Sequence, residues 1–427
     1  MLRNDPGLTG RSRRRRWARP AAMLSAAGMA AGFASAVGTT SSFGATAHTV
    51  AATNKSNASS SFLACEVTDT GGINDRSFNA SAYAGLKAAV AVDPKIVPKF
   101  LSSTSTSDYT PNINDFISEH CGIIVTVGYD MAEATQTAAK ANPHTDFAIV
   151  DCPGGTAAGC PGFSSSETTL PNIDNLAYET NEDAFLGGYL AAAMAKSNSI
   201  APGGAVGEFG GQNIPTVTIY MDGWVAGVRY YDEVNHKSVK VFGWYPTSKG
   251  RTADNYTGSG LFTNNFTDDG LGKTDTQTLI GEGASVIFSV AGGVGLGAVA
   301  AIQAADSSTP GSVEMEWVDT DGCVSDPSGC KYFITSVTKG IVPSVETAVL
   351  AAARHTFKGG FYTGDLANNG VSLSPYHDFA SKVPASVTSE LNKVKAGIES
   401  GKISVNPCKY PAAAATPATS LSSVCSG

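Results

Sequence analysis

Short apolar runs alternate with helical patterns along most of the chain, from residue 62 to residue 357. Strands are expected at 62–67, 121–127, 147–150, 205–209, 239–244, 284–291 and 313–318. Helices are expected at 80–90, 131–141, 183–196, 217–231, 274–282, from 292 onward and at 344–357. This alternation favours parallel sheets covered by helices. The units suffice for two sheets of about five or six strands each.

The first strand leads directly into a polar loop that contains one aromatic residue. Its candidate ligand contacts are Asp69, Asn74, Asp75, Phe78 and Asn79. Ligands of open α/β sheets bind at the carboxyl ends of the strands. Carboxylates, two amides and an aromatic ring suit a flat, polar small molecule, whereas a phosphate prefers bare amides and a cation. The same rule predicts three further ligand-binding candidates after later strands: Tyr129, Asp130 and Asp151. Asp130 and Asp151 can equally be ordinary turn residues.

The two ends of the chain have the composition of processing and linking segments. Residues 1–47 carry seven arginines, an Ala-rich apolar run and the small-residue site Ala45-Thr-Ala47, which is typical of a cleaved export signal. The paired arginines leave Sec and twin-arginine export both open. Residues 48–60 indicate a flexible linker, and 409–427 indicate a low-complexity tail. The protein is therefore expected to be exported, to a periplasm or to the cell surface.

Removal of the signal makes the protein more acidic. The full sequence has a net charge of −8, and the loss of seven Arg and one Asp leaves 22 basic against 36 acidic residues, or −14. An acidic surface is unsuited to nucleic acid or to anionic membranes. We therefore expect neither as a partner.

All eight cysteines follow the signal, and an even number in an exported chain indicates disulfides. The expected pairs are Cys65–Cys121, Cys152–Cys160, Cys323–Cys330 and Cys408–Cys425. A metal site is disfavoured, because no Cys-x-x-Cys occurs and the six histidines are scattered. Cys65 has a second interpretation as a lipid-modified residue, but it lies inside the first expected strand and far from the apolar run of the signal.

Enzyme motifs are weak or missing in the sequence. The glycines of residues 293–297 follow a strand and open a helix, as in a dinucleotide fingerprint, but this unit lies late in the chain. Neither a Gly-x-Ser-x-Gly elbow nor a His-Glu-x-x-His helix occurs. We expect no enzymatic activity, no cofactor and no metal.

At this point the chain resembles the basic membrane protein family of substrate-binding proteins, which includes purine nucleoside receptors of ABC transporters. The resemblance spans about residues 62–379 and rests on an ordered set of motifs. These are Val67-Thr-Asp-Thr-Gly-Gly-Ile-Asn-Asp-Arg-Ser-Phe-Asn79, Phe147-Ala-Ile-Val-Asp151, Tyr189-Leu-Ala-Ala-Ala-Met194, Gly223-Trp-Val-Ala-Gly227, Gly283-Ala-Ser-Val-Ile-Phe288, Val318-Asp-Thr-Asp321 and Thr335-Ser-Val-Thr-Lys339.

The resemblance implies which residues contact the base of a nucleoside. Asp69 and Asn79 would hydrogen-bond its edge, and Phe78 and Phe266 would stack on its two faces. Stacking of this kind adds about 0.5–1.5 kcal/mol beyond area burial. The segment before Phe266 is longer than is usual in the family, which leaves two alternatives for the second ring: Tyr256 and Phe262.

The resemblance also implies the contacts to the sugar. Gly292 would let the backbone approach it, Asp319 would accept from the ribose hydroxyls, and Lys339 would donate to them. A buried carboxylate that requires a hydroxyl partner rejects ligands that lack one.

The implied fold is the type I periplasmic-binding-protein fold, an α/β fold of two doubly wound parallel-sheet lobes joined by a three-crossover hinge. The expected lobes are 61–176 with 338–360, and 177–337 with 361–408. The implied function is capture of a nucleoside, with purine favoured, by a monomer that delivers it to an ABC transporter permease. The alternative is a ligand-sensing receptor of a signalling system with the same fold.

Overall fold

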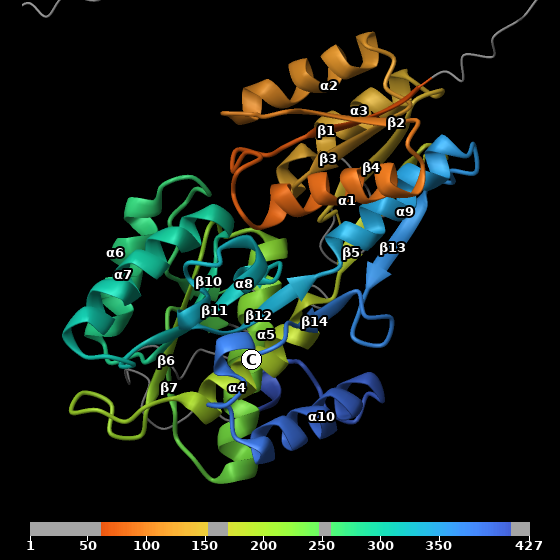
Figure 1. Ribbon diagram of the computed structural model, residues 1–427. Helices are drawn as coiled ribbons and strands as arrows, with labels where there is room; N and C mark the ends of the chain where they lie inside the picture. The colour runs from red at the N-terminus through yellow and green to blue at the C-terminus, as the bar shows by residue number, and fades with distance from the viewer. Residues whose placement is uncertain (1–60, 153–169, 247–257, 411–427) are drawn as a thin grey trace, which may run out of the picture. The chain divides into compact units, whose positions relative to one another are not determined.

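Two six-stranded sheets form the framework of the computed structural model, which describes residues 61–152, 170–246 and 258–410. The first sheet is parallel throughout, in the order β13-β5-β4-β3-β1-β2 (Figure 1). Its strands are β1 (Phe62–Val67), β2 (Ile96–Leu101), β3 (Ile123–Val127), β4 (Asp146–Val150), β5 (Ile173–Tyr178) and β13 (Gly360–Gly364).

The second sheet has the order β14-β12-β11-β10-β6-β7 and is parallel except for β14, which runs antiparallel to β12. Its strands are β6 (Ala205–Gly210), β7 (Lys240–Phe242), β10 (Val286–Val290), β11 (Glu314–Asp319), β12 (Phe333–Lys339) and β14 (Val371–Leu373). A separate antiparallel pair consists of β8 (Trp244–Pro246) and β9 (Gly258–Gly260).

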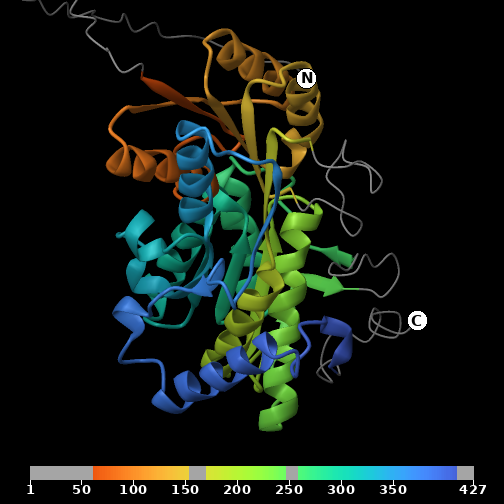
Figure 2. The same cartoon turned by 90° about the vertical axis from the view of Figure 1, so that its right-hand side faces the viewer.

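Helices cover the sheets. α1 (Phe78–Val92) and α9 (Ile341–Ala353) pack side by side on one face of the first sheet (Figure 1), and α2 (Tyr109–Ser118) and α3 (Ala132–Ala141) cover the other. Figure 2 shows the long α5 (Pro215–Asn235) beside α4 (Thr180–Met194). The remaining helices are α6 (Asp269–Gly281), α7 (Gly295–Ser308), α8 (Gly322–Ser325) and α10 (Ala385–Glu399).

The alternation of side chains along the strands explains why both faces need helices. On β1, Ala64 packs in the core below α1, whereas Cys65 and Val67 pack in the core below α2. β1 is buried on both faces, which is the pattern of a parallel sheet covered from two sides, although one of its buried residues is the carboxylic acid Glu66. Helix ends follow ordinary rules: α5 begins with Pro215, and Asp268 accepts hydrogen bonds from the first backbone amides of α6.

One expected strand, 239–244, is in fact two. It breaks at Gly243, whose φ is +94° and where an added Cβ would lie 1.7 Å from the carbonyl oxygen of Glu208. Only glycine fits this position, so the chain leaves the second sheet there and starts β8. Strands β2, β5, β13 and β14 and helices α2 and α10 are further elements beyond those expected from the sequence.

The chain crosses between the two sheets three times, as the type I periplasmic-binding-protein fold requires: from β5 to α4, from β12 to α9 and from β13 to β14. A strand remains with its sheet to its last paired residue. Pairing therefore assigns residues 177–178 and 361–364 to the first sheet and 338–339 to the second, in each case opposite to the expected division. We place the lobe boundaries after residues 178, 339 and 364.

Two expected disulfides are confirmed, Cys65–Cys121 and Cys323–Cys330. Cys152 and Cys408 are disulfide-bonded as well. Their expected partners, Cys160 and Cys425, lie outside the described residues, as do the expected signal and linker and nearly all of the tail. Cys65 is fully buried within β1, and its bond to Cys121 rules out a lipid on its sulfur.

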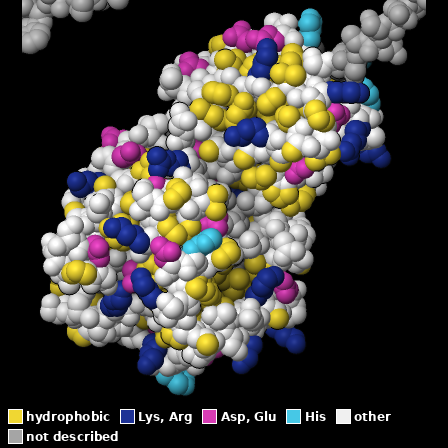
Figure 3. Space-filling view, viewed as in Figure 1, with side chains coloured by type: hydrophobic (Ala, Val, Ile, Leu, Met, Phe, Trp, Pro, Cys, Tyr) yellow, Lys and Arg dark blue, Asp and Glu magenta, His cyan; other side chains and the backbone are white. Residues whose placement is uncertain are grey.

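Figure 3 shows basic and acidic side chains interspersed on one face of the described residues, with no patch of a single sign. Within 61–152, 170–246 and 258–410, none of the helices combines the length and the apolar character that a membrane crossing requires.

The two confirmed disulfides should differ in their effect on stability. Cys65→Ala with Cys121→Ala opens a link of 56 residues and should lower the free energy of unfolding by about 4 kcal/mol. Cys323→Ala with Cys330→Ala opens a link of 7 residues and should cost about 2 kcal/mol. Urea denaturation of both variants measures the difference. A larger loss for the short link would contradict the chain-entropy explanation.

Candidate ligand-binding site

A pocket lies at the carboxyl ends of strands from both sheets, with about 660 Å³ of space that includes its opening to solvent. Of the residues that the sequence analysis proposes, it is lined by Asp69, Asp75, Phe78, Asn79, Tyr129, Asp130, Asp151, Phe266, Gly292, Asp319 and Lys339. Asn74 is exposed and does not line it, because it lies at the solvent side of its loop. Residues as far apart in the sequence as Asp69 and Lys339, 270 positions, therefore meet in one pocket at the ends of the strands, where ligands of such sheets bind.

Asp69 is held by the amide of Asn79. Its Oδ1 accepts from Asn79 Nδ2 at 2.7 Å and from Gly71 N at 2.8 Å, while its own N–H donates to Asn79 Oδ1. Among the described residues its Oδ2 has no hydrogen-bond partner, and it lies against Gly128, where a Cβ would come within 3.3 Å. Asp69 therefore has one carboxylate oxygen available to a ligand.

Burial raises the pKa of Asp69 to about 7, and repulsion from Asp75 adds to the shift, although the hydrogen bond from Asn79 opposes it. The carboxyl thus changes its charge near neutral pH, where a ligand that donates a hydrogen bond favours the ionised form.

Asp75 and Asn79 are committed to the protein itself. The carboxylate of Asp75 accepts from the backbone amides of Ser77, Asn79 and Ala80 and so caps the start of α1. Both hydrogens of the Asn79 amide are used, one on Asp69 and one on Asp75. These two residues position Asp69 and Phe78, and Asn79 has no donor left for a base edge in this arrangement.

Two phenylalanines line the pocket from different sheets. Phe78 is the first residue of α1, and Phe266 lies in the loop before α6. Phe266 lies against Gly211, where an added Cβ would meet the ring at 2.1 Å. Of the alternatives to Phe266, Phe262 packs edge-to-face on Trp244 and does not line the pocket, and Tyr256 lies outside the described residues.

Lys339 lies between two carboxylates at the end of β12. Its Nζ is 2.6 Å from Asp151 Oδ2 and 3.3 Å from Asp319 Oδ1, and it lies 4.9 Å from the ring centre of Phe78. Burial disfavours its charge, but the attraction of Asp151 and Asp319 outweighs this and raises the pKa of Lys339. Burial raises the pKa of Asp151 to about 6, with Lys339 opposing that shift. Lys339 and Asp151 are therefore mostly charged at pH 7.

Asp319 receives further donors from both lobes. Ser77 Oγ donates to its Oδ2 at 2.9 Å, and the hydroxyl of Tyr220 donates to its Oδ1 at 3.3 Å. Asp151 and Asp319 both have left-handed backbone, with φ of 64° and 66°. Such conformations are uncommon for residues other than glycine and persist where the surroundings hold them.

Sequence reasoning missed several lining residues, among them Gln212, Thr216, Tyr220 and Tyr109. Gln212 follows the Gly-Gly end of β6, so the strand-end rule could have found it. Tyr109, Thr216 and Tyr220 lie on helices α2 and α5, where helical periodicity does not separate a lining residue from a core residue.

Comparison with known proteins is consistent with this geometry. The sequence model for ABC transporter substrate-binding proteins of the PnrA-like (Bmp) kind matches residues 62–261 and 259–407. The chain belongs to this family. Its members are substrate-binding proteins rather than a class of enzymes.

Individual relatives support the same family assignment. An ABC transporter nucleoside-binding protein, BmpA, of Lactococcus lactis subsp. cremoris is 30% identical over 352 residues, which cover 79% of this chain and 87% of the relative. Basic membrane protein A1 of Borrelia garinii subsp. bavariensis is 27% identical, over 68% of this chain and 73% of its own. The solved structure of an ABC solute-binding protein from Aeropyrum pernix K1 superimposes with a TM-score of 0.66 at 22% identity, over 80% of this chain and 92% of its own, which shows the shared fold.

Removal of Lys339 should destabilise the protein strongly. Lys339→Met leaves Asp151 and Asp319 buried without a cation, which should cost about 3 kcal/mol at pH 7. Lys95→Met removes an exposed lysine and is the matched control. Urea denaturation of both variants is the measurement, and a loss below about 1 kcal/mol for Lys339→Met would show that the ion pairs contribute little.

Proposed function

We propose that this protein binds a nucleoside, with purine nucleosides favoured, outside the cytoplasm and delivers it to the permease of an ABC importer. The observation that carries the proposal is that Phe78 and Phe266, one from each lobe, line the same pocket as the free oxygen of Asp69 and the group around Lys339. The relative from Lactococcus, whose name states nucleoside binding, supports the same ligand class.

The polar groups of the pocket match the two halves of a nucleoside. Asp69 Oδ2 can accept from an N–H of a base, and the two rings can stack on its faces. Lys339 uses two of its three hydrogens on Asp151 and Asp319 and retains one for a hydroxyl. Asp151 has Oδ1 without a partner among the described residues, which can accept from a second hydroxyl.

The charge of the pocket favours an unphosphorylated ligand. Five aspartates line it, namely Asp69, Asp75, Asp130, Asp151 and Asp319, and Lys339 is the one basic residue in that lining, all within the described residues. Because Lys339 is already paired with two carboxylates, it offers little attraction to a phosphate, and the carboxylates repel one.

The first test is a thermal-shift screen of the purified mature protein against nucleosides, nucleotides, free bases, sugars and amino acids. Guanosine or inosine should raise the melting temperature, because a ligand that binds the folded state stabilises it. The corresponding 5′-monophosphates should not. Asp319→Asn should abolish the response to the nucleosides. A clear response to another class, with none to any nucleoside, would overturn the proposal.

The affinity should depend on pH through Asp69. Since its pKa is about 7 in the unliganded pocket and a donor on the ligand requires the carboxylate, protonation competes with binding. The Kd should therefore rise as the pH falls below 7, by up to about tenfold per pH unit. Calorimetry from pH 5.5 to 8 measures the profile. Asp69→Asn, which cannot ionise, should bind weakly with a flatter profile; an equally steep profile in that variant would assign the effect to another group.

A further inference from the structure

The loop between β1 and α1 contacts the second lobe through two neighbouring side chains. Arg76 Nη1 lies 2.6 Å from Asp326 Oδ1, and Ser77 Oγ shares its one hydrogen between the carbonyl of Val318 at 3.0 Å and Asp319 Oδ2 at 2.9 Å. The partners of Arg76 and Ser77 lie at or beyond the end of β11, about 240–250 positions along the chain. We call residues 75–77 the bridging segment.

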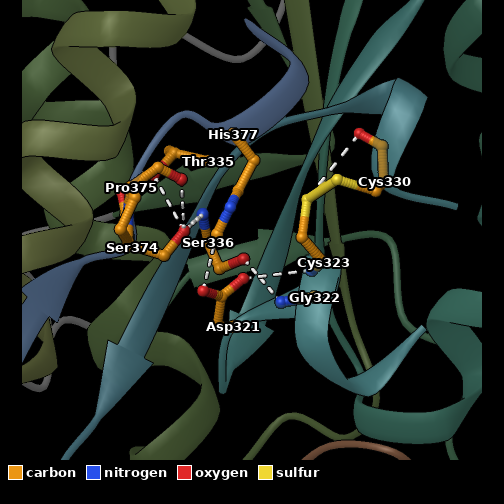
Figure 4. Close-up of polar contacts among 9 residues, drawn as sticks. All are labelled: Asp321, Gly322, Cys323, Cys330, Thr335, Ser336, Ser374, Pro375 and His377. Atoms are coloured by element: carbon orange, nitrogen blue, oxygen red, sulfur yellow. Dashed lines mark hydrogen bonds and ion pairs between the residues drawn. A yellow bond between two sulfur atoms is a disulfide. The ribbon is translucent and has the colours of Figure 1, made fainter. Parts of the chain in front are cut away.

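Asp326 occupies a rigid loop that holds its carboxylate ready for a cation. Its side chain is 3% exposed, and Ser328 Oγ donates to the same Oδ1 at 2.7 Å. The loop is closed by the Cys323–Cys330 disulfide (Figure 4). We call residues 323–330 the disulfide loop.

The disulfide loop is also fixed to the sheet at its start. Figure 4 shows Asp321 and Gly322, which immediately precede the disulfide loop. Asp321 accepts from the amide of Cys323, and the amide of Gly322 donates to Ser336 Oγ on β12. His377 Nε2 lies 2.7 Å from Asp321 Oδ2 and adds a contact from the segment after β14. Asp326 is therefore carried by the second lobe as a fixed group.

The bridging segment is held from its own side as well. Asp75 accepts from the amides of Ser77 and Asn79, which fixes the backbone on both sides of Arg76. Arg76 has φ of 53°, a left-handed conformation that is unfavourable for arginine and persists where neighbouring contacts impose it. Its side chain is 49% exposed and does not line the pocket. Arg76 therefore does not touch a ligand in the pocket, and any effect it has on one is indirect.

We propose that Arg76 and Asp326 are positioning residues for ligand capture: their ion pair stabilises the arrangement in which both lobes line the pocket, and so sets how slowly a ligand leaves. The proposal rests on the proposed function only in requiring a ligand. Ser77 links the ion pair to the pocket, because it is the neighbour of Arg76 and orients the Asp319 carboxylate. A protein that already favours the binding-competent arrangement binds with higher apparent affinity.

The physical basis is the buried carboxylate. Loss of the guanidinium leaves Asp326 without its cation in a site that excludes water, a penalty that separation of the lobes relieves by exposing the carboxylate. An exposed ion pair within one lobe has no such effect. Lys99 and Glu119, both about half exposed and both in the first lobe, form such a pair and serve as the control.

The test compares Arg76→Ala with Lys99→Ala, each of which removes one lysine or arginine from one ion pair. With guanosine as the probe, Arg76→Ala should raise the Kd and the dissociation rate roughly tenfold and leave the association rate within about twofold. Arg76→Lys should restore part of the affinity, since it keeps the charge but not the planar fork. Lys99→Ala should match the wild type. An unchanged dissociation rate in Arg76→Ala, or an equal change in Lys99→Ala, would overturn the proposal.

A second measurement needs no ligand. Small-angle X-ray scattering of the unliganded protein should give a larger radius of gyration for Arg76→Ala than for the wild type or Lys99→Ala. Asp326→Asn removes the buried carboxylate together with the ion pair, so it should have a smaller effect than Arg76→Ala, and adding it to Arg76→Ala should reduce the effect of that variant. If no nucleoside binds the wild type, the proposed function fails while the scattering still decides the role of Arg76. If guanosine binds but neither scattering nor kinetics changes, the ion pair is without effect and the function stands.

Discussion

The ion pairs of Lys339 are the interaction on which the arrangement of the site depends. Asp151 directly follows β4 of the first sheet, Asp319 is the last residue of β11 in the second, and Lys339 is the last residue of β12, where the chain crosses from one lobe to the other. One buried ammonium thus pairs with a carboxylate from each lobe at a crossover. Two aspartates this close would repel one another without it.

The same arrangement determines what the pocket can accept. Lys339 is ion-paired with Asp151 and Asp319, and these carboxylates offset its positive charge. The pocket therefore presents carboxylate oxygens and aromatic faces to a ligand instead of a positive site. Carboxylates select for ligands that donate hydrogen bonds, and aromatic rings select for flat ones. A neutral ligand with a ring at one end and hydroxyls at the other satisfies both conditions.

Local rules predicted the parallel sheets and the side of the pocket that the first lobe forms, and the family resemblance supplied the type I fold and, from the second lobe, Phe266, Gly292, Asp319 and Lys339. β1 begins and ends at the expected residues, and the strand-end rule located Asp69 and Asp151. The rule identifies a loop but does not say which way a side chain points, so it included the exposed Asn74. It also could not separate a ligand contact from a cap, which is the role that Asp75 has at the start of α1.

The features that could not be predicted from the sequence depend on contacts between distant segments. The break at Gly243 results from the carbonyl of Glu208 on the neighbouring strand, and the Arg76–Asp326 pair joins residues 250 positions apart. Neither partner of such a contact carries a local signal, since Gly243 follows an ordinary β pattern and Arg76 belongs to a polar loop.

The two sheets have the same strand order but different chemistry at corresponding strand ends. After β4 and β11 the chemistry is shared: Asp151 and Asp319 have nearly the same φ and share Lys339. After β1 and β6 it differs, because the first sheet carries Asp69 where the second has the glycine Gly211. The missing side chain at Gly211 is the space that the ring of Phe266 occupies. The matching strand ends, with Asp151 and Asp319, therefore join the lobes through Lys339. The differing strand ends place the carboxylate of Asp69 on one side of the pocket and the ring of Phe266 on the other. This second pair can distinguish one ligand from another.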